Sequence, residues 1–408
     1  MGGNVLVKDA SGQEHRADTV DFSKLKGLTR SALVKDFTEM FSAIDSLYSS
    51  EFGETLWPPG QVRALVSSGK IFTGSTEHLF DPKISDDEFV QYKPSIGDID
   101  VTVPGDKLSN LYTLLTGLTG SRTFSDFSMQ YIGKKESGTG ALSDKSTQIH
   151  AIFGYKFSPD APPVRVQIDF VASTFSRGEP SEFTRFAKSS SWTDIKTGGV
   201  KGVFHKLLLR SLSTIMSMQK DSVWLTAGSP LHPPEKVKVS KISEPIRTRS
   251  FSVDRGLRVS AEEQPITVGG KRAFKKIEPK DSKYLTDLQE IFESIFGSPP
   301  VGSEMSQFRT FYGLLELMNV HFDDRQIADV YSDFIEKLFG AGADQINAYD
   351  PEPDRVAKSS ALAAFREKFS FLSRFDREIE DKMATFYDSY RTRTFESLLR
   401  SSRARYLD

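Results

Sequence analysis

The chain has 408 residues, of which 38% are hydrophobic and 26% charged, and its formal net charge at pH 7 is −2. This length exceeds one typical domain, and the composition is that of a globular chain. Because the net charge is close to zero, any surface that binds nucleic acid must be local. There is no cysteine, which excludes disulfides, cysteine-containing zinc sites, iron–sulfur clusters and thiol nucleophiles.

The sequence contains no run of about 18 apolar residues and no signal-peptide core at its N-terminus. We therefore expect a cytoplasmic protein without a membrane partner. The sequence leaves the oligomeric state open.

Hydrophobic spacing and composition divide the chain into four predicted regions. Residues 1–56 form an N-terminal helical region, and residues 57–220 form a domain of strands and helices. Residues 221–280 form a basic segment that contains β-strands, and residues 281–408 form a helical C-terminal domain. The predicted fold class is α+β, with a mixed β-sheet and helices.

The first half of the chain carries clear periodic signals. Apolar residues recur at intervals of three and four from residue 23 to residue 48, which predicts a helix that ends before Gly53. Further elements are predicted, in chain order, as a helix over 61–67, a strand over 70–72, a strand over 98–103, a helix over 107–118, and strands over 148–155 and 164–171.

Two acidic residues stand two positions apart in the predicted strand over 98–103. Successive side chains of a strand point to opposite faces, so Asp98 and Asp100 point the same way. Two carboxylates at this spacing can share a divalent cation, which prefers oxygen ligands. The predicted strand over 164–171 carries Asp169, which can face the first two. A solvated strand surface is the alternative, although aspartate is a poor strand former.

Three motifs in combination resemble the polymerase-beta-type nucleotidyltransferase superfamily. They are the Gly74-Ser75 pair at the end of a strand, the strand Gly97-Asp98-Ile99-Asp100-Val101, and the later hydrophobic strand that bears Asp169. The resemblance covers roughly residues 70–170. The stretch from Thr76 to Gly97 is longer than the compact spacing usual in that family.

The resemblance implies a nucleotidyltransferase with a palm-like mixed sheet. Such an enzyme moves a nucleoside monophosphate from a nucleoside triphosphate, for example ATP, to an acceptor hydroxyl by two-metal catalysis with Mg²⁺ or Mn²⁺. By the same resemblance, Asp98, Asp100 and Asp169 would be the catalytic and metal-binding residues. Gly74 and Ser75 would bind the triphosphate.

Residues beyond the acidic motif are further candidates. His150 can approach the acidic face or be an ordinary packed residue. Lys201 and His205 lie at the start of a helix predicted over 204–219, where positive charge is unfavourable unless an anion such as a triphosphate binds. Simple solvation is the alternative. Phe186 and residues 189–191 would contact the base and sugar by resemblance, or form an ordinary loop.

The segment 236–276 carries eleven basic residues against four acidic ones. Its apolar residues indicate short strands. A basic segment of this kind can follow the phosphate backbone of RNA or DNA, or be a solvated linker. The candidate nucleic-acid-binding residues are Arg247, Arg249, Arg255 and Arg258.

The last third of the chain has helical spacing. One helix is predicted over 285–295, capped by Asp281 or Ser282 and ended by Gly297. Further helices are predicted over 304–319, 324–339, 354–373 and 376–401.

Three functions remain open from the sequence. The first is a nucleotidyltransferase that acts on a nucleic-acid end, which the basic segment favours. The second is a nucleotidyltransferase that modifies a small molecule or a protein, and the third is a catalytically silent binding protein with this fold. The three intact aspartates argue against the third. The sequence does not identify the nucleotide.

Overall fold

The computed structural model divides the chain into two units, Met1–Lys196 and Thr197–Asp408. Both units combine helices with β-strands, so the α+β class and the mixed sheet expected from the sequence are confirmed. The structure describes residues 7–8, 13–25, 27–120, 123–124, 126–134, 148–160, 162–198, 200, 202–216, 246–268, 271–276, 283–338 and 351–375.

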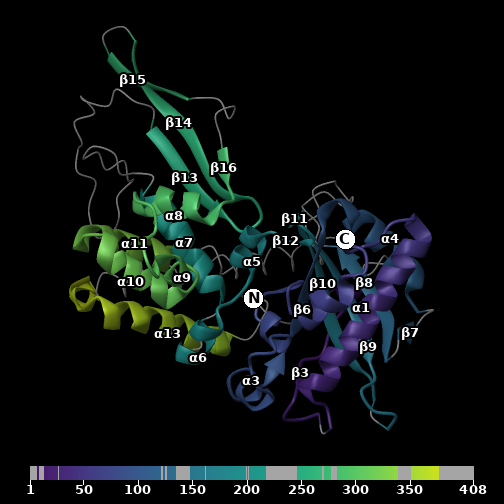
Figure 1. The fold of residues 1–408 in the computed structure, drawn as a ribbon. Coiled ribbons are helices and arrows are strands. Elements are labelled where there is room, and N and C mark those ends of the chain that lie inside the picture. Colours follow the sequence, from purple (N-terminus) through teal and green to yellow (C-terminus); the bar gives the residue numbers. More distant parts are fainter. Residues whose placement is uncertain are drawn as a thin grey trace, which may run out of the picture. The chain divides into compact units, whose positions relative to one another are not determined.

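The N-terminal unit is built on a six-stranded sheet with the order β4-β6-β10-β9-β8-β7 (Figure 1). The strands β6 and β10 run parallel, and every other neighbouring pair is antiparallel. The strands are β4 (Phe72–Thr73), β6 (Asp98–Pro104), β7 (Thr123–Phe124), β8 (Phe127–Lys134), β9 (Gln148–Tyr155) and β10 (Val164–Ser173).

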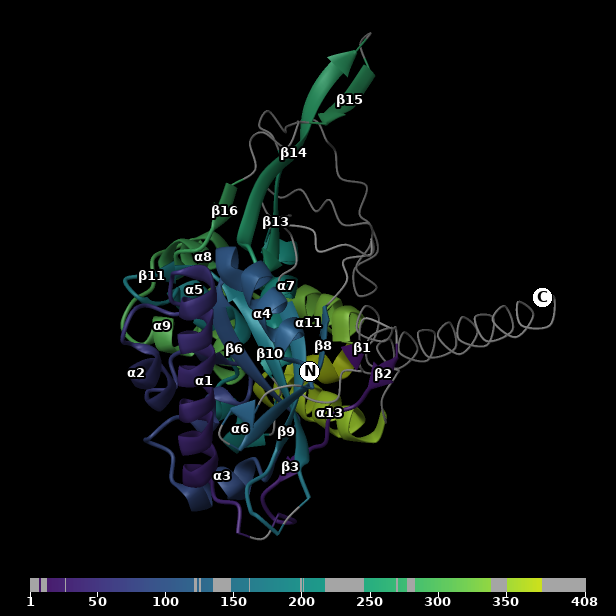
Figure 2. The ribbon, with the colours of Figure 1, turned by 90° about the vertical axis from the view of Figure 1, so that its right-hand side faces the viewer.

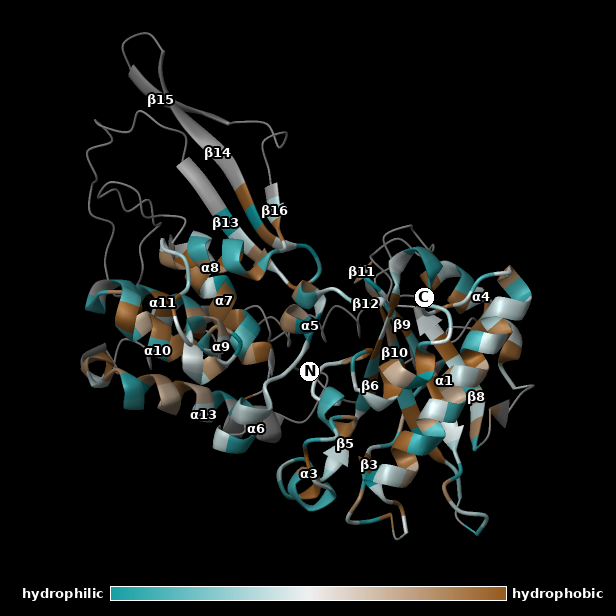
Figure 3. Cartoon of the chain, viewed as in Figure 1, coloured by the Kyte–Doolittle hydropathy of each residue, from teal (hydrophilic) through white to brown (hydrophobic). Residues whose placement is uncertain are grey.

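One face of this sheet is apolar because its strands alternate between apolar and polar residues. Ile99, Ile168 and Ala151 on this face are fully buried, in one core with residues of the helices α1 (Arg30–Phe52) and α4 (Leu108–Leu118). In Figure 3 the helices of both units carry brown and teal residues together, as amphipathic helices do. The helices therefore cover the apolar face of the sheet, and the aspartates lie on the opposite face.

The helix α1 has a defined cap at each end. It begins at Arg30, later than the predicted residue 23, because the Thr29 hydroxyl accepts a hydrogen bond from the Ala32 amide. It ends at Gly53, whose φ of 73° is the left-handed conformation that glycine adopts readily. Since α1 shares a core with the sheet, α1 is packed onto the predicted domain 57–220, and the two do not form separate bodies.

The remaining elements of the N-terminal unit are short and surround the sheet. They are β1 (Val7–Lys8), β2 (Glu14–His15), β3 (Val20–Asp21), α2 (Val62–Ser67), the 3-10 helix η1 (Glu77–Leu79), α3 (Asp86–Tyr92), β5 (Ser95–Ile96), the 3-10 helix η2 (Gly105–Lys107), β11 (Phe175–Ser176), β12 (Glu179–Pro180), α5 (Glu182–Lys188) and α6 (Trp192–Gly198). The unit boundary falls within α6, after Lys196.

The second unit joins helices to an antiparallel sheet. The sheet has the order β13-β14-β15, and β16 also pairs with β14. Figures 1 and 2 both show the β14–β15 hairpin extending away from the helices of this unit. Its elements are α7 (Gly202–Met216), β13 (Ile246–Ser252), β14 (Gly256–Val268), β15 (Lys271–Lys276), β16 (Lys283–Leu285), α8 (Leu288–Phe296), α9 (Glu304–Gln307), α10 (Phe311–His321), α11 (Asp324–Glu336), α13 (Pro351–Lys368) and η6 (Ser370–Phe375).

The boundary between the units precedes α7, whereas the sequence placed a boundary at residue 220. The helix α7 contacts α10, α11 and β13, and its Leu208, Leu209 and Leu212 are buried. These leucines tie α7 to the second unit.

Three helix predictions in this unit are corrected. The helix expected over 354–373 ends at Lys368 and is followed by the 3-10 helix η6. The helix expected over 285–295 starts at Leu288, because Leu285 pairs with Leu257 in the sheet and Asp287 caps the helix. The helix expected over 304–319 is two helices, since Thr310 caps α10 after α9 has ended. Asp281, Ser282 and residues 376–401 lie outside the described residues.

A membrane-spanning segment was not expected from the sequence. Among the helices of the described ranges, none is both long enough and apolar enough to cross a bilayer.

The buried contacts of α1 generate a stability prediction. The Phe41 ring is fully buried against Trp57, Phe72 and Phe170, so Phe41→Ala should lower the free energy of unfolding by roughly 3–5 kcal/mol through lost burial and a cavity. Denaturant unfolding followed by tryptophan fluorescence measures this change. The control Lys35→Ala, on the exposed side of the same helix, should change it by less than about 0.5 kcal/mol. Equal effects of the two would contradict the packing described.

Candidate metal centre

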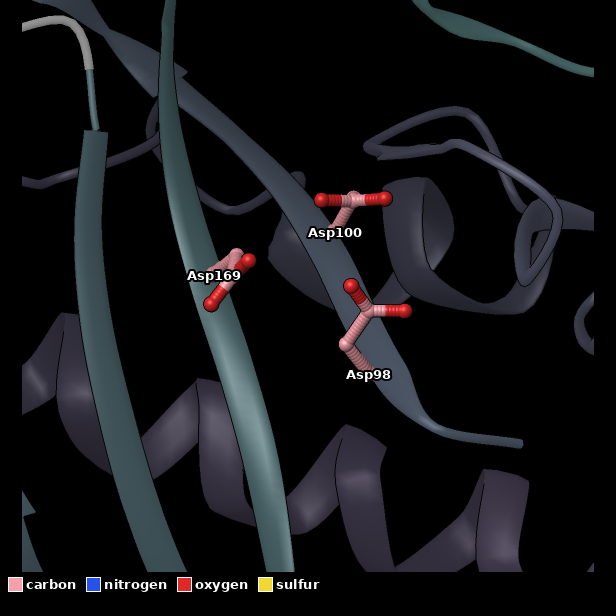
Figure 4. Close-up of side chains that lie close together, drawn as sticks. All are labelled: Asp98, Asp100 and Asp169. Atoms are coloured by element: carbon pink, nitrogen blue, oxygen red, sulfur yellow. The ribbon is translucent and has the colours of Figure 1, made fainter. Parts of the chain in front are cut away.

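Three carboxylates converge on the polar face of the sheet in the N-terminal unit. Asp98 and Asp100 project from β6, and Asp169 projects from the parallel neighbour β10, where it stands directly beside Asp100. One carboxylate oxygen of each residue lies within 4.8 Å of the other two. Figure 4 shows the three side chains on the same side of the two strands. The convergence predicted from strand alternation is confirmed.

The three carboxylates are poorly solvated. Asp98 is 6% exposed and Asp169 is 2% exposed, whereas Asp100 keeps partial access to solvent. Burial, and then the charges of Asp98 and Asp169, raise the pKa of Asp100 well above its ordinary value, and the nearby Lys188 opposes this only in part. The protein alone therefore does not balance the negative charge at this position.

Asp169 is held in place by three side-chain donors. Its Oδ1 accepts from His150 Nδ1 at 2.8 Å and from Gln167 Nε2 at 2.9 Å, and its Oδ2 accepts from Gln148 Nε2 at 2.9 Å. Hydrogen bonds to a carboxylate are short and strong. His150 therefore does approach the acidic group, as a partner of Asp169.

Strand register explains why these residues meet. Residues directly opposite each other on neighbouring strands share a face. The pairs β4–β6, β6–β10 and β10–β9 place one polar residue from each strand in a continuous row, namely Thr73, Asp100, Asp169 and His150.

Gly74 makes room for Asp100. Its φ is 71°, and a Cβ atom built on it would lie 2.1 Å from Asp100 Oδ2. A side chain at this position would force the Asp100 carboxylate to move. Both the left-handed backbone and the close approach of the carboxylate therefore favour glycine here.

The turn at Gly74 is fixed by a segment more than a hundred residues later. The Gly74 amide donates to the Lys188 carbonyl at 2.9 Å, and the Ser190 amide donates to the Gly74 carbonyl at 3.1 Å. The Gly74 amide is thus occupied by the Lys188 carbonyl. Ser75 remains the candidate of this pair, since neither its amide nor its hydroxyl has a hydrogen-bond partner in the described part of the chain.

The long stretch between Ser75 and Asp98 is folded. It contains η1, α3 and β5. The buried Arg30 guanidinium donates to the carbonyls of Leu79 and Ile84 and so ties this stretch to α1. His78 Nε2 lies 2.7 Å from the Ser190 carbonyl and donates to it. Burial lowers the pKa of His78 to about 4, so the ring is neutral at pH 7.

The candidates for base and sugar contacts have structural partners. The Phe186 ring is buried in α5. The Ser189 hydroxyl donates to Glu77, and the Ser191 hydroxyl accepts from the Asp194 amide at the start of α6. The loop interpretation therefore holds only for residues 189–191, because Phe186 lies in the helix α5. Residues 188–190 support the Gly74 turn.

His205 is not available to bind a nucleotide. It is 2% exposed, its Nε2 donates to the Phe308 carbonyl at 3.0 Å, and its Nδ1 accepts from Lys206 Nζ at 2.9 Å. Burial, and then the charge of Lys206, lower the pKa of His205 well below its ordinary value. The expected positive charge on this ring is therefore absent, and His205 offers no charge that a bound anion would balance. Lys201 lies outside the described residues.

The four candidate arginines do not share one surface. Register places Arg249 on the face of the second sheet that bears Leu257, and Arg258 on the opposite face. Arg249 Nε donates to the Ser294 hydroxyl of α8. Arg255 is exposed in the turn between β13 and β14. Arg249 and Arg258 therefore cannot both contact one phosphate backbone that lies along a single face of the sheet.

Sequence reasoning missed two residues of the centre. Gln148 and Gln167 were not candidates, although each lies at an alternate strand position that faces Asp169. The same alternation that selected the aspartates, applied to amide side chains, would have found them.

Comparisons of the chain with models of protein families, with curated proteins and with solved structures find no match. The case for function therefore rests on the residues of the centre and on the three motifs.

The close approach of Gly74 to Asp100 predicts an unusual substitution effect. Gly53 has the same left-handed backbone, with φ of 73°, but a Cβ atom built on it would have no neighbour within 4 Å. Gly53→Ala should therefore lower the free energy of unfolding by about 1 kcal/mol through backbone strain alone. Gly74→Ala should lower it by about 1–3 kcal/mol more, because the methyl group collides with the carboxylate. Denaturant titration measures both, and equal losses would contradict the contact.

The raised pKa of Asp100 predicts a pH effect. The folded metal-free chain holds this proton more tightly than the unfolded chain, so stability should fall as pH rises from the ordinary value of 3.8 through the raised pKa. In EDTA at pH 7, Asp100→Asn should raise the melting temperature by about 2–4 °C for each kcal/mol of repulsion removed. The exposed control Asp106→Asn should leave it unchanged. A lower melting temperature for Asp100→Asn would show that the protein itself stabilises this charge.

Proposed function

We propose that the protein is a metal-dependent nucleotidyltransferase that moves a nucleoside monophosphate from a nucleoside triphosphate to an acceptor hydroxyl. The observation that carries the proposal is the convergence of Asp98, Asp100 and Asp169, each with an oxygen within 4.8 Å of the others. The resemblance of the surrounding motifs to polymerase-beta-type nucleotidyltransferases supplies the reaction.

The donor set fits Mg²⁺ or Mn²⁺. The three residues offer only carboxylate oxygens, which hard divalent cations prefer. The burial of Asp98 and Asp169 and the raised pKa of Asp100 both favour an added positive charge. A solvated acidic surface has neither property, so these observations support the metal-site interpretation over that alternative.

Different residues of the chain would have different roles in the reaction. Asp98, Asp100 and Asp169 would hold the cations, which when bound neutralise the triphosphate and lower the pKa of the attacking hydroxyl. His150 and Gln148 fix the direction of the Asp169 carboxylate. Preorganisation of this kind reduces the rearrangement needed at the transition state.

The Gly74 turn supplies the contact for the triphosphate. Gly74 sets the turn beside Asp100, and its backbone is fixed by Lys188 and Ser190. The amide and hydroxyl of Ser75 then provide donors to the phosphate oxygens, as backbone amides in such turns do.

A nucleic-acid end is the acceptor class that we propose. The described strands β13–β15 and their connections carry eight basic residues and three acidic ones. Four of the six residues of β15 are lysine or arginine, and the hairpin extends away from the helices of its unit (Figure 2). Such a strand suits a phosphate backbone, whose binding is largely electrostatic. A small-molecule or protein acceptor would not need it.

The proposal predicts metal-dependent label transfer. With Mg²⁺ and α-labelled nucleoside triphosphates, the protein should label an RNA or DNA end. Asp98→Asn and Asp169→Asn should each reduce the rate at least a hundredfold, which corresponds to about 2.7 kcal/mol in the barrier. The matched control Asp106→Asn changes an exposed aspartate just after β6 and should keep full activity.

The acceptor panel separates the remaining functions. Labelling of protein or of a small molecule, but not of RNA or DNA, would replace the nucleic-acid acceptor and keep the transferase. Triphosphate binding without label transfer to any acceptor would favour the silent binding protein. Full activity of both aspartate variants would overturn the proposed centre.

A further inference from the structure

Gln167 occupies an unusual position beside the three carboxylates. It is fully buried, stands directly beside Asp98 in the parallel pair of β10 with β6, and donates its Nε2 to Asp169 Oδ1 at 2.9 Å. Its side chain therefore lies on the acidic face, with one end already engaged.

The other end of the Gln167 amide is without a hydrogen-bond partner among the described residues. Its Oε1 is buried and accepts no hydrogen bond in the part of the chain that the structure describes. Exchanging the oxygen and nitrogen of the amide does not help, because the ionised Asp169 can only accept and must face the nitrogen. The orphaned atom is thus an acceptor.

A buried acceptor without a donor is unfavourable, and its presence needs an explanation. The neighbouring Asp98, Asp100 and Asp169 offer only more acceptor oxygens when ionised. A positive charge or a hydrogen-bond donor from outside the chain would satisfy these acceptor oxygens.

We propose that Gln167 Oε1 is a fourth oxygen of the divalent-cation site, in contact with the cation or with a water molecule that the cation holds. This inference rests on the proposed function, since it adds a residue to the same site. Gln167 then has two tasks: its nitrogen positions Asp169, and its oxygen joins the oxygen shell of the cation.

Gln148 offers a matched control within the same site. Its Nε2 donates to Asp169 Oδ2 at 2.9 Å, so it positions the same carboxylate as Gln167 does. Gln148 is only partly buried. If Gln167 acted solely through Asp169, loss of either amide would have the same effect.

The test is a Mn²⁺ titration of the full-length protein, in which electron paramagnetic resonance measures free Mn²⁺. Gln167→Met keeps the length of the side chain and removes both amide atoms, and it should weaken binding by about 10–100-fold. Gln148→Met should weaken binding less than Gln167→Met does, because it removes only one hydrogen bond that positions Asp169, and His150 and Gln167 still hold that carboxylate. Gln167→Glu keeps an oxygen at this position but cannot donate to Asp169, and it should bind Mn²⁺ at least as tightly as the wild type.

Melting temperatures in EDTA give a second readout. Gln167→Met should lose no more stability than Gln148→Met, because it also removes the orphaned acceptor, whereas a purely structural role predicts a larger loss with unchanged Mn²⁺ affinity. Equal weakening by the two methionine variants, unchanged binding by Gln167→Met, or weaker binding by Gln167→Glu would overturn the inference while the cation site stands. Absence of Mn²⁺ binding by the wild type would overturn the cation site itself, and the inference with it.

Discussion

Repulsion among three carboxylates on one face of a sheet is the constraint on which the rest of this site depends. Asp98, Asp100 and Asp169 are brought together by the parallel pairing of β6 with β10, and two of them are almost fully buried. The packed core on the other face of the sheet holds the strands in this register. Gly74 leaves room for one carboxylate, and three donors fix another. The fold thus maintains an arrangement that a cation would stabilise.

Much of the N-terminal unit follows from local patterns in the sequence. Alternation placed the aspartates on one face, and the spacing of apolar residues found α1, although its start had to come from the Thr29 cap. In the second unit, the start of α8 could not be read from spacing, because Leu285 fits a helical pattern yet pairs with Leu257 in a strand. The pairing with a distant strand therefore determines where this helix begins.

The rest of the site depends on such distant contacts. No local pattern shows that residues 188–190 occupy the backbone of Gly74, or that Arg30 anchors the element after Ser75. Burial makes His205 neutral, which its position at a helix start did not reveal. Register likewise separates Arg258 from Arg249, although both lie in one basic segment. Composition gives the charge of a segment and not the face on which each charge lies.

A crystal structure of the protein with Mn²⁺ and a non-hydrolysable nucleoside triphosphate would show whether the three carboxylates hold metal. We expect anomalous density for Mn²⁺ in contact with oxygens of Asp98, Asp100 and Asp169, and triphosphate oxygens at the Ser75 turn. Mn²⁺ density elsewhere, with these three carboxylates free of metal, would rule out the proposed centre.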